Sequence, residues 1–261
     1  VFARRRRGLG ERLRAFGLRL STVRDEVDGH LSVRGLGRKR VLAAVTRLLD
    51  TTLIRVGNEE YAADNETYGA TTLLPEHVVD TGRRLHLDFV GKGGIEWSVP
   101  VTDPAVRKVI RESVEATRGD LFFDEGDGAP GDVTSADVND FLRELAGEEF
   151  SAKDFRTWGG TAHVTDHLAP LELGGDPADL ERDELAAIDR AAEVLGNTRT
   201  VARACYVAPH VPASWRAGPL AEVWRASRAS ARLTRPEQAT ARVLADFVLP
   251  ATAAPDAPAD N

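Results

Sequence analysis

Several kinds of residue are scarce or absent in this chain of 261 residues. It has no methionine, one cysteine (Cys205), and no apolar run approaching the ~20 residues that cross a bilayer. A single cysteine excludes an internal disulfide framework and fits a reducing compartment. Charged residues interrupt the apolar stretch 9–20. We therefore expect a cytoplasmic protein with no signal peptide and no membrane segment.

Lysine is also scarce. Of the 34 basic residues, only four are lysines. In a chain so dominated by arginine, a lysine raises the question whether arginine would serve equally well at that position. A dissociable proton is the property that arginine cannot supply. The four lysines are Lys39, Lys92, Lys108 and Lys153.

The formal net charge of −7 conceals an uneven distribution. Residues 1–47 carry thirteen basic and four acidic side chains, a net of +9, so the remainder carries −16. A basic segment joined to an acidic body can still bind a polyanion on one face. A solvated amphipathic helix explains the same charges equally well.

Hydrophobic periodicity predicts a mainly α fold with a small antiparallel β-hairpin or sheet. The strands are expected at 84–90 and 95–101, joined by a glycine-rich turn at 91–94. The tail 251–261, rich in Ala, Pro and Asp, is expected to be disordered. Helices are expected at about 9–31, 38–55, 58–61, 104–117, 134–147, from 151 onward, 179–195, 198–207, 214–229 and 235–248.

Two familiar kinds of site are not indicated. No P-loop is present, so we expect no nucleotide cofactor. His163 and His167 lie four residues apart on an expected helix, but no third ligand is evident. Cys205 has no paired histidine that would make it a nucleophile. We therefore expect neither a metal nor any other cofactor.

The informative feature is a dispersed series of five short segments. Considered together, they resemble the catalytic domain of type IB DNA topoisomerases, in particular the small poxvirus and bacterial enzymes. The resemblance runs from about 38 to 210, and its strength lies in the ordered series, because each segment alone is weak. The segments are Ile54–Tyr61 (IRVGNEEY), Asn65–Leu73 (NETYGATTL), Val90–Gly94 (VGKGG), Lys153–Trp158 (KDFRTW), and Gly196–Thr198 with Tyr206 nine residues after Asn197.

The resemblance implies that Tyr206 attacks a DNA phosphodiester and forms a 3′-phosphotyrosyl linkage. A phenol of pKa ~10 is a suitable nucleophile because it also leaves again readily, so resealing reverses cleavage. The family pattern places Arg55 and Arg156 on the nonbridging oxygens of that phosphate. Guanidinium stays protonated and its fork matches a phosphate, so it can stabilise the transition state without a metal.

The same resemblance places Lys92, on the hairpin turn, as the general acid that protonates the departing 5′-oxygen. Lys153 matches a second lysine of that step. Two of the four lysines thus stand where a dissociable proton is useful. Asn197 occupies a position where viral and eukaryotic members carry histidine. An amide can still donate a hydrogen bond there, but it contributes no acid–base chemistry.

The resemblance further implies a monomer that relaxes supercoiled double-stranded DNA without ATP or metal, and acts in the cytoplasm on nucleoid DNA. We expect one catalytic domain, 1–250, made of a basic helical segment (1–37), a core (38–210) and C-terminal helices (211–250). Family members also carry an N-terminal β-rich clamp domain, and we expect it to be truncated from this chain. DNA contacts are expected from Arg38, Lys39, Arg40, Tyr61 and Arg203.

Two other functions fit parts of the sequence. Tyrosine recombinases and integrases share the fold and the nucleophile. They typically carry His-x-x-Arg around the second arginine, where this chain has Lys153, and often His or Trp where it has Asn197. A catalytically silent DNA-binding domain is the other alternative, suggested by the acidic body and the missing clamp.

Overall fold

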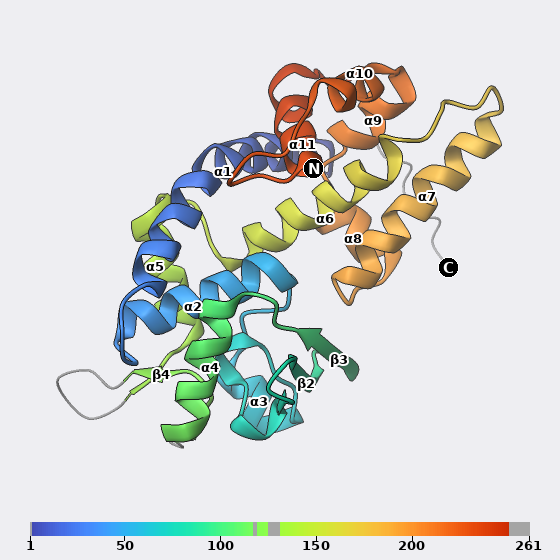
Figure 1. Cartoon of the computed structure of the whole chain (residues 1–261). Coiled ribbons are helices and arrows are strands. Elements are labelled where there is room, and N and C mark those ends of the chain that lie inside the picture. Colours follow the sequence, from blue (N-terminus) through green and yellow to red (C-terminus); the bar gives the residue numbers. More distant parts are fainter. Residues whose placement is uncertain (1, 117–118, 125–130, 251–261) are drawn as a thin grey trace. The chain divides into compact units, whose positions relative to one another are not determined.

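A computed structural model describes residues 2–116, 119–124 and 131–250. Across these ranges the chain is mainly helical with a small antiparallel sheet, as the sequence predicts (Figure 1). The expected disordered tail, 251–261, lies outside the described residues. The chain forms two compact units. We call Thr22–Arg156 the sheet unit, and Val1–Ser21 with Thr157–Asn261 the helical unit.

In the sheet unit, helix α2 (Arg38–Thr52) lies against α4 (Pro104–Ala116) and α5 (Ser135–Ala146) (Figure 1). Nine of its residues are buried, among them Val41, Val45 and Leu48. The i, i+3, i+4 spacing of these apolar residues is what gives α2 its core-facing side. The second part of α1 (Phe2–Leu31) belongs to this unit, and Arg24 binds Asp50 of α2 with an Nε–Oδ2 distance of 2.8 Å.

The sheet has the order β1 (Val78–Asp80), β2 (Leu85–Gly91), β3 (Ile95–Pro100), with every neighbour antiparallel. Its register pairs Gly91 with Ile95 at the hairpin turn and His86 with Pro100 at the opposite end. Short helical segments, α3 (Glu59–Asn65), η1 (Ala70–Thr72) and η2 (Pro75–His77), precede the sheet. A second small sheet pairs β4 (Phe123–Asp124) with β5 (Gly131–Asp132).

Helix starts in the sheet unit follow from side-chain caps that are visible in the sequence. The Asp103 carboxylate accepts from Ala105 N at 2.8 Å at the start of α4. Thr134 and Asp137 form a reciprocal capping box at the start of α5. Asp154 accepts from Ser151 N at 2.9 Å where α6 (Ala152–Leu168) begins. Each cap satisfies backbone N–H groups that the first helical turn leaves without a partner.

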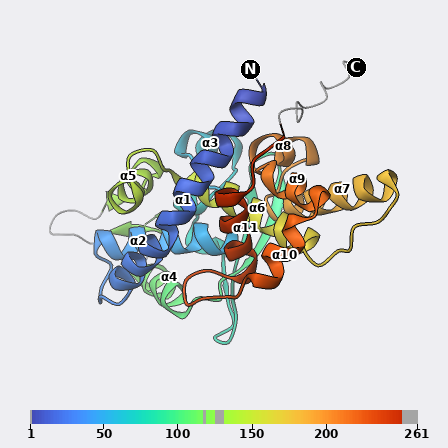
Figure 2. The ribbon, with the colours of Figure 1, turned by 90° about the horizontal axis from the view of Figure 1, so that it is seen from above.

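The helical unit contains most of α6, then α7 (Pro177–Val194), α8 (Arg199–Cys205), α9 (His210–Ala217), α10 (Pro219–Ala226) and α11 (Arg235–Asp246). In both views α7 lies beside α8, and α9, α10 and α11 lie together (Figure 2). Their shared core includes Val164, Leu168, Val211, Trp215 and Leu220.

Two features of the helical unit depart from or extend the sequence prediction. The single helix predicted at 214–229 is wrong, because the chain breaks into α9 and α10 at Gly218, whose φ is 100°. Pro219 then opens α10, consistent with the preference of proline for a first helical position. Trp158 of α6 lies edge-on to Phe16 of α1 and donates from Nε1 to the buried Glu237 carboxylate at 2.9 Å.

Candidate active site

Two arginines of the predicted site are brought together in the sheet unit. Helix α2 ends at Leu53, which takes the left-handed conformation with φ 58°. The carbonyl oxygen of Leu53 accepts a hydrogen bond from Nη1 of Arg156 on α6. Arg55 follows Leu53 by two residues and is half-buried, whereas Arg156 is only 4% exposed. Residues about a hundred positions apart in sequence therefore meet at the end of α2.

A close approach of two glycines holds the segment that contains Arg55. The carbonyl oxygen of Arg55 accepts from Ala70 N at 2.9 Å, and that of Val56 from Thr71 N at 2.7 Å. A Cβ on Gly69 would lie 2.6 Å from the Cα of Gly57, closer than real atoms approach. The segments 54–61 and 65–73, which carry part of the family resemblance, thus pack directly on one another.

The same segment reaches the hairpin that carries Lys92. Tyr68 N donates to the Val90 carbonyl oxygen at 2.8 Å, two residues before Lys92. Lys92 itself is exposed at the turn between β2 and β3. The backbone bonds from Arg55 to Ala70 and from Tyr68 to Val90 therefore connect the arginine segment with the lysine turn inside one unit.

A row of aromatic rings supports the hairpin, and sequence reasoning missed it. The Tyr68 ring lies edge-on to His77 at 4.4 Å, and Phe89 stacks on Trp97 at 6.2 Å. Gly91 is required beside this row, because a Cβ there would lie 2.6 Å from Nε1 of Trp97. The signal available in the sequence was the cross-strand register, in which Phe89 faces Trp97.

Burial within this row affects one titratable group. Desolvation lowers the pKa of His77, and the nearby Glu76 carboxylate partly opposes that shift. His77 Nδ1 accepts from Leu74 N at 3.0 Å, which fits a neutral ring with its proton on the other nitrogen. His77 is thus a packing residue beneath the hairpin.

Lys153 and Arg156 share the first turns of α6. Lys153 is exposed, and three residues later Arg156 is buried. The spacing puts the two side chains on neighbouring parts of one helix face. Of the six predicted catalytic residues, four therefore belong to the sheet unit: Arg55, Lys92, Lys153 and Arg156.

The helical unit carries the other two, Tyr206 and Asn197. Tyr206 caps the C-terminus of α8, where its N–H donates to the Ala202 carbonyl oxygen at 3.0 Å, and it is 7% exposed. Its own carbonyl oxygen accepts from the Thr161 hydroxyl of α6 at 3.2 Å. Asn197 precedes α8, and its N–H donates to the Ala192 carbonyl oxygen at 2.9 Å. One short helix therefore separates these two residues.

The residues expected to contact DNA occupy different environments. Arg38 and Lys39 are exposed and lie near acids, Arg38 with an Nη2–Oδ1 distance of 2.6 Å to Asp137. Arg203 is exposed and its Nη2 lies 3.3 Å from Oε1 of Glu184. Arg40 is 3% exposed and pairs with Glu112, which ties α2 to α4. The side chain of Tyr61 lies outside the described residues.

Metal-binding clusters and membrane-spanning helices are both absent from the described residues. Within them, no group of three or more His, Cys, Asp or Glu side chains could hold a metal ion. His163 is exposed and His167 is partly buried on α6. None of the helices in the described ranges has the length and apolar character needed to cross a membrane.

The chain matches a known protein family over most of its length. Residues 11–210 match the family described as eukaryotic DNA topoisomerase I, catalytic core. Because the match covers most of the chain, the chain belongs to this family. The type IB resemblance of the five segments is thereby confirmed at the level of the family.

Individual relatives support the same family. A DNA topoisomerase 1B of Acanthamoeba polyphaga mimivirus is 26% identical over 179 residues, which cover 65% of this chain and 53% of the relative. DNA topoisomerase 1 of Daucus carota is 30% identical over 176 residues, which cover 64% of this chain and 21% of the relative. The chain thus spans about half or less of the length of these relatives.

Proposed function

We propose that this chain is the catalytic domain of a type IB DNA topoisomerase, which relaxes supercoiled double-stranded DNA by cutting and rejoining one strand. One observation carries most of the proposal beside family membership. Hydrogen bonds at Leu53, Arg55 and Val90 link the segments that carry Arg55, Arg156 and Lys92 within the sheet unit. Cationic residues on three linked segments suit the charge of a phosphate in reaction.

In the proposed reaction the Tyr206 hydroxyl gives its proton to solvent water, and its oxygen attacks phosphorus. A bond from the tyrosine oxygen to phosphorus forms while the bond to the 5′-oxygen breaks. Lys92 gives a proton to that leaving oxygen, with Lys153 assisting the same transfer. The phosphodiester is thereby exchanged for a phosphotyrosyl ester of similar energy, so no ATP is needed. Rotation of the cut strand about the intact one precedes the reverse step.

The other predicted residues stabilise charge. Arg55 and Arg156 bind the nonbridging oxygens, where negative charge grows in the pentacoordinate transition state. The Arg156 side chain is held in two ways: it is buried, and its Nη1 donates a hydrogen bond to the Leu53 carbonyl oxygen. The Asn197 amide donates a hydrogen bond to a phosphate oxygen.

The proposal extends to the finer type of enzyme. We assign the chain to the small poxvirus and bacterial type, acting as a monomer on cytoplasmic DNA. Support comes from the viral relative, which this chain covers to 53%, whereas it covers the plant relative to 21%. Asn197, where the viral and eukaryotic pattern has histidine, favours a bacterial origin.

A relaxation assay tests the proposal. Supercoiled plasmid is incubated with the chain in EDTA without ATP, beside a Tyr206→Phe variant of matched thermal stability. We expect stepwise relaxation and, after denaturation, a nick linked to protein, both absent from the variant. Linked nicks with strand exchange but no relaxation would indicate a recombinase. Binding without either product would indicate a silent DNA-binding domain and sink the proposal.

A further inference from the structure

A hollow of about 510 Å³ lies at the end of the sheet opposite the Lys92 turn, and no step of the proposed reaction uses it. Its lining contains three arginines and one histidine (Arg83, Arg84, Arg107 and His86) and no carboxylate. The remaining lining residues are neutral. For a chain with a net charge of −7, such a set of like charges is unexpected.

The arginines of the hollow differ from others in the sheet unit. Arg24, Arg47 and Arg111 are paired with the carboxylates of aspartates. Within the ranges that the structure describes, neither Arg83, Arg84 nor Arg107 lies within ion-pair distance of a carboxylate. The charge of Arg107 does help to lower the pKa of Asp80, but that carboxylate is hydrogen-bonded to Arg111 and does not line the hollow. Positive charges that gather around a hollow without a carboxylate in its lining create a local potential that attracts an anion.

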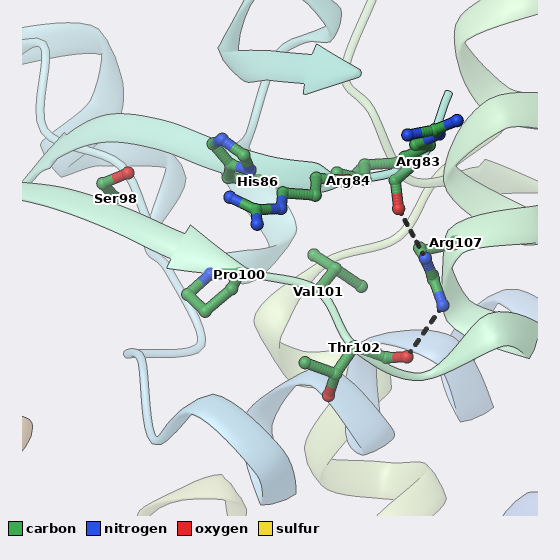
Figure 3. A pocket seen from close by; sticks show the side chains of 9 residues that line it. Arg83, Arg84, His86, Ser98, Pro100, Val101, Thr102 and Arg107 are labelled. Carbon is green, nitrogen blue, oxygen red and sulfur yellow. Dashed lines mark hydrogen bonds between the residues drawn. The ribbon is translucent and has the colours of Figure 1, made fainter. Parts of the chain in front are cut away.

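The guanidinium of Arg107 is held in place by backbone rather than by acid. It donates to the Thr102 carbonyl oxygen at 3.1 Å and to the Arg83 carbonyl oxygen at 3.4 Å, while Arg84 extends along the strand toward His86 (Figure 3). Carbonyl partners orient a guanidinium without removing its charge. The arrangement is therefore preorganised for a ligand of opposite charge.

The turn that presents Arg83 and Arg84 is also well supported. Gly82 N donates to Asp80 Oδ1 at 2.7 Å, and Thr81 N donates to the Arg84 carbonyl oxygen at 2.9 Å. Arg111 donates to both Asp80 and the Gly82 carbonyl oxygen. Because the turn is fixed, the arginines have little backbone entropy to lose when a ligand binds.

We propose that this hollow binds a phosphate group, and that its source is the backbone of a nucleic-acid strand. Planar guanidinium forks match phosphate oxygens, and Arg83 and Arg84 are exposed, so a polymer can lie across them. Lys92 follows His86 by six positions along the hairpin, which is roughly 20 Å at ~3.3 Å per position. The bound phosphate is therefore not the one that reacts.

The assignment of the phosphate to a nucleic-acid backbone rests on the proposed function, in which DNA is the substrate. The test uses an Arg83→Gln/Arg84→Gln variant, which leaves the backbone partners of Arg107 intact. Its control, Arg143→Gln/Arg182→Gln, removes the same charge from exposed arginines that already pair with acids. Fluorescence anisotropy measures binding of a labelled DNA duplex as a function of salt, and thermal shift measures binding of inorganic phosphate and of triphosphate.

We expect the variant, but not the control, to reduce the magnitude of the slope of log affinity against log salt by about 0.9, the value for one lost phosphate contact. Single-turnover cleavage at saturating DNA should be unchanged. Unaltered DNA binding, with loss of stabilisation by phosphate and triphosphate in the variant alone, would assign the site to a free phosphate. If neither the DNA duplex nor the phosphate probes separate the variant from the control, the inference is wrong.

The outcome is distinguishable from failure of the proposed function. Absence of relaxation by the unmutated chain bears on Tyr206 and its partners, not on the hollow. The phosphate and triphosphate measurements do not depend on DNA cleavage or on DNA binding. They therefore decide the anion site even if the chain proves not to be a topoisomerase.

Discussion

The two units position their predicted catalytic residues by different means. In the sheet unit, Arg55, Arg156 and the Lys92 hairpin depend on hydrogen bonds between segments far apart in sequence. In the helical unit, Tyr206 and Asn197 flank a single short helix, and the Thr161 hydroxyl adds a distant contact to the Tyr206 carbonyl oxygen. Placement of the cationic residues thus depends on tertiary packing, whereas local helix geometry sets the spacing between Tyr206 and Asn197.

Part of the positive charge in the basic N-terminal region is neutralised by ion pairs within the sheet unit. Arg24, Arg40 and Arg47, all within the segment of net charge +9, pair with acids inside the sheet unit. Their charge is therefore already compensated in the folded chain. Arg38 and Lys39 also lie near acids, Asp137 and Glu144, but unlike the buried Arg40 their side chains stay exposed.

The largest effect is expected at the hairpin turn. Lys92→Ala removes the proposed general acid and should slow DNA cleavage by about 10²–10⁴-fold. A substrate with a better 5′ leaving group, such as a bridging sulfur, should restore the rate because it needs no proton. Single-turnover cleavage measures both. Lys108→Ala, a change to an exposed lysine near Glu112 on α4, should leave the rate unaltered.

If the better leaving group does not rescue Lys92→Ala, the lysine has another role. The same pair of substrates with Lys153→Ala tells whether the second lysine belongs to the same proton transfer. Partial rescue there is the expected result.

The next effect tests packing in the sheet unit. Gly69→Ala forces a Cβ against Gly57 and the Arg55 carbonyl oxygen, where backbone atoms lie 2.5–2.7 Å away. Backbone cannot move as a flexible side chain can, so we expect the free energy of unfolding to fall by about 1–3 kcal/mol. Urea denaturation measures the change.

Gly29→Ala on α1 is the matched control, because a Cβ there meets nothing within 4 Å. It should stabilise the chain by about 0.5–1 kcal/mol through helix propensity. Equal destabilisation by both substitutions would show that the Gly57–Gly69 contact is not tight.

A smaller effect on stability is expected in the helical unit. Gly160→Ala places a Cβ 2.9 Å from Cδ1 of Leu195 and 3.3 Å from the Tyr206 carbonyl oxygen. The end of the Leu195 side chain can shift, and alanine is more favourable than glycine in a helix by about 0.5–1 kcal/mol. The free energy of unfolding should therefore change little. Cleavage should nevertheless slow, because the Tyr206 backbone must move. A change in stability without a change in rate would contradict this.

The smallest effect is a pH dependence at the turn before β2. The Arg111 guanidinium, with help from Gly82 N, lowers the pKa of Asp80 to about 2. Since this pKa lies below its unfolded value of ~3.9, the stabilisation is present above about pH 4 and is lost as pH falls toward 2. Asp80→Asn should therefore lower the urea midpoint at pH 5 more than at pH 2.5.

Asp88→Asn, at an exposed position of β2 in the same sheet, is the control for the change of charge. A difference between Asp80→Asn and the unmutated chain that is the same at both pH values would mean that the ion pair does not stabilise the turn.

Much of the fold was predictable because its signals are local. Asp103, Thr134 and Asp154 stand at helix starts and cap them through contacts within three residues, so residue type alone favours a helix start at each position. The hairpin follows from alternation and a glycine turn, and the predicted bounds of its two strands are confirmed within a residue at each end. The error at 214–229 was also local, since Gly218 followed by Pro219 is a signal that favours a break.

The candidate site was predictable only as a set of residues. The sequence by itself determined the family and the helix caps, and it singled out candidate catalytic residues such as Tyr206 and Lys92, because these depend on residue type and spacing. Only the tertiary structure decided that Gly57 packs on Gly69, that Arg40 is buried against Glu112, and that Arg84 and Arg107 line one hollow. These contacts join residues 12 to 72 positions apart, and no local periodicity records which distant segments pack together.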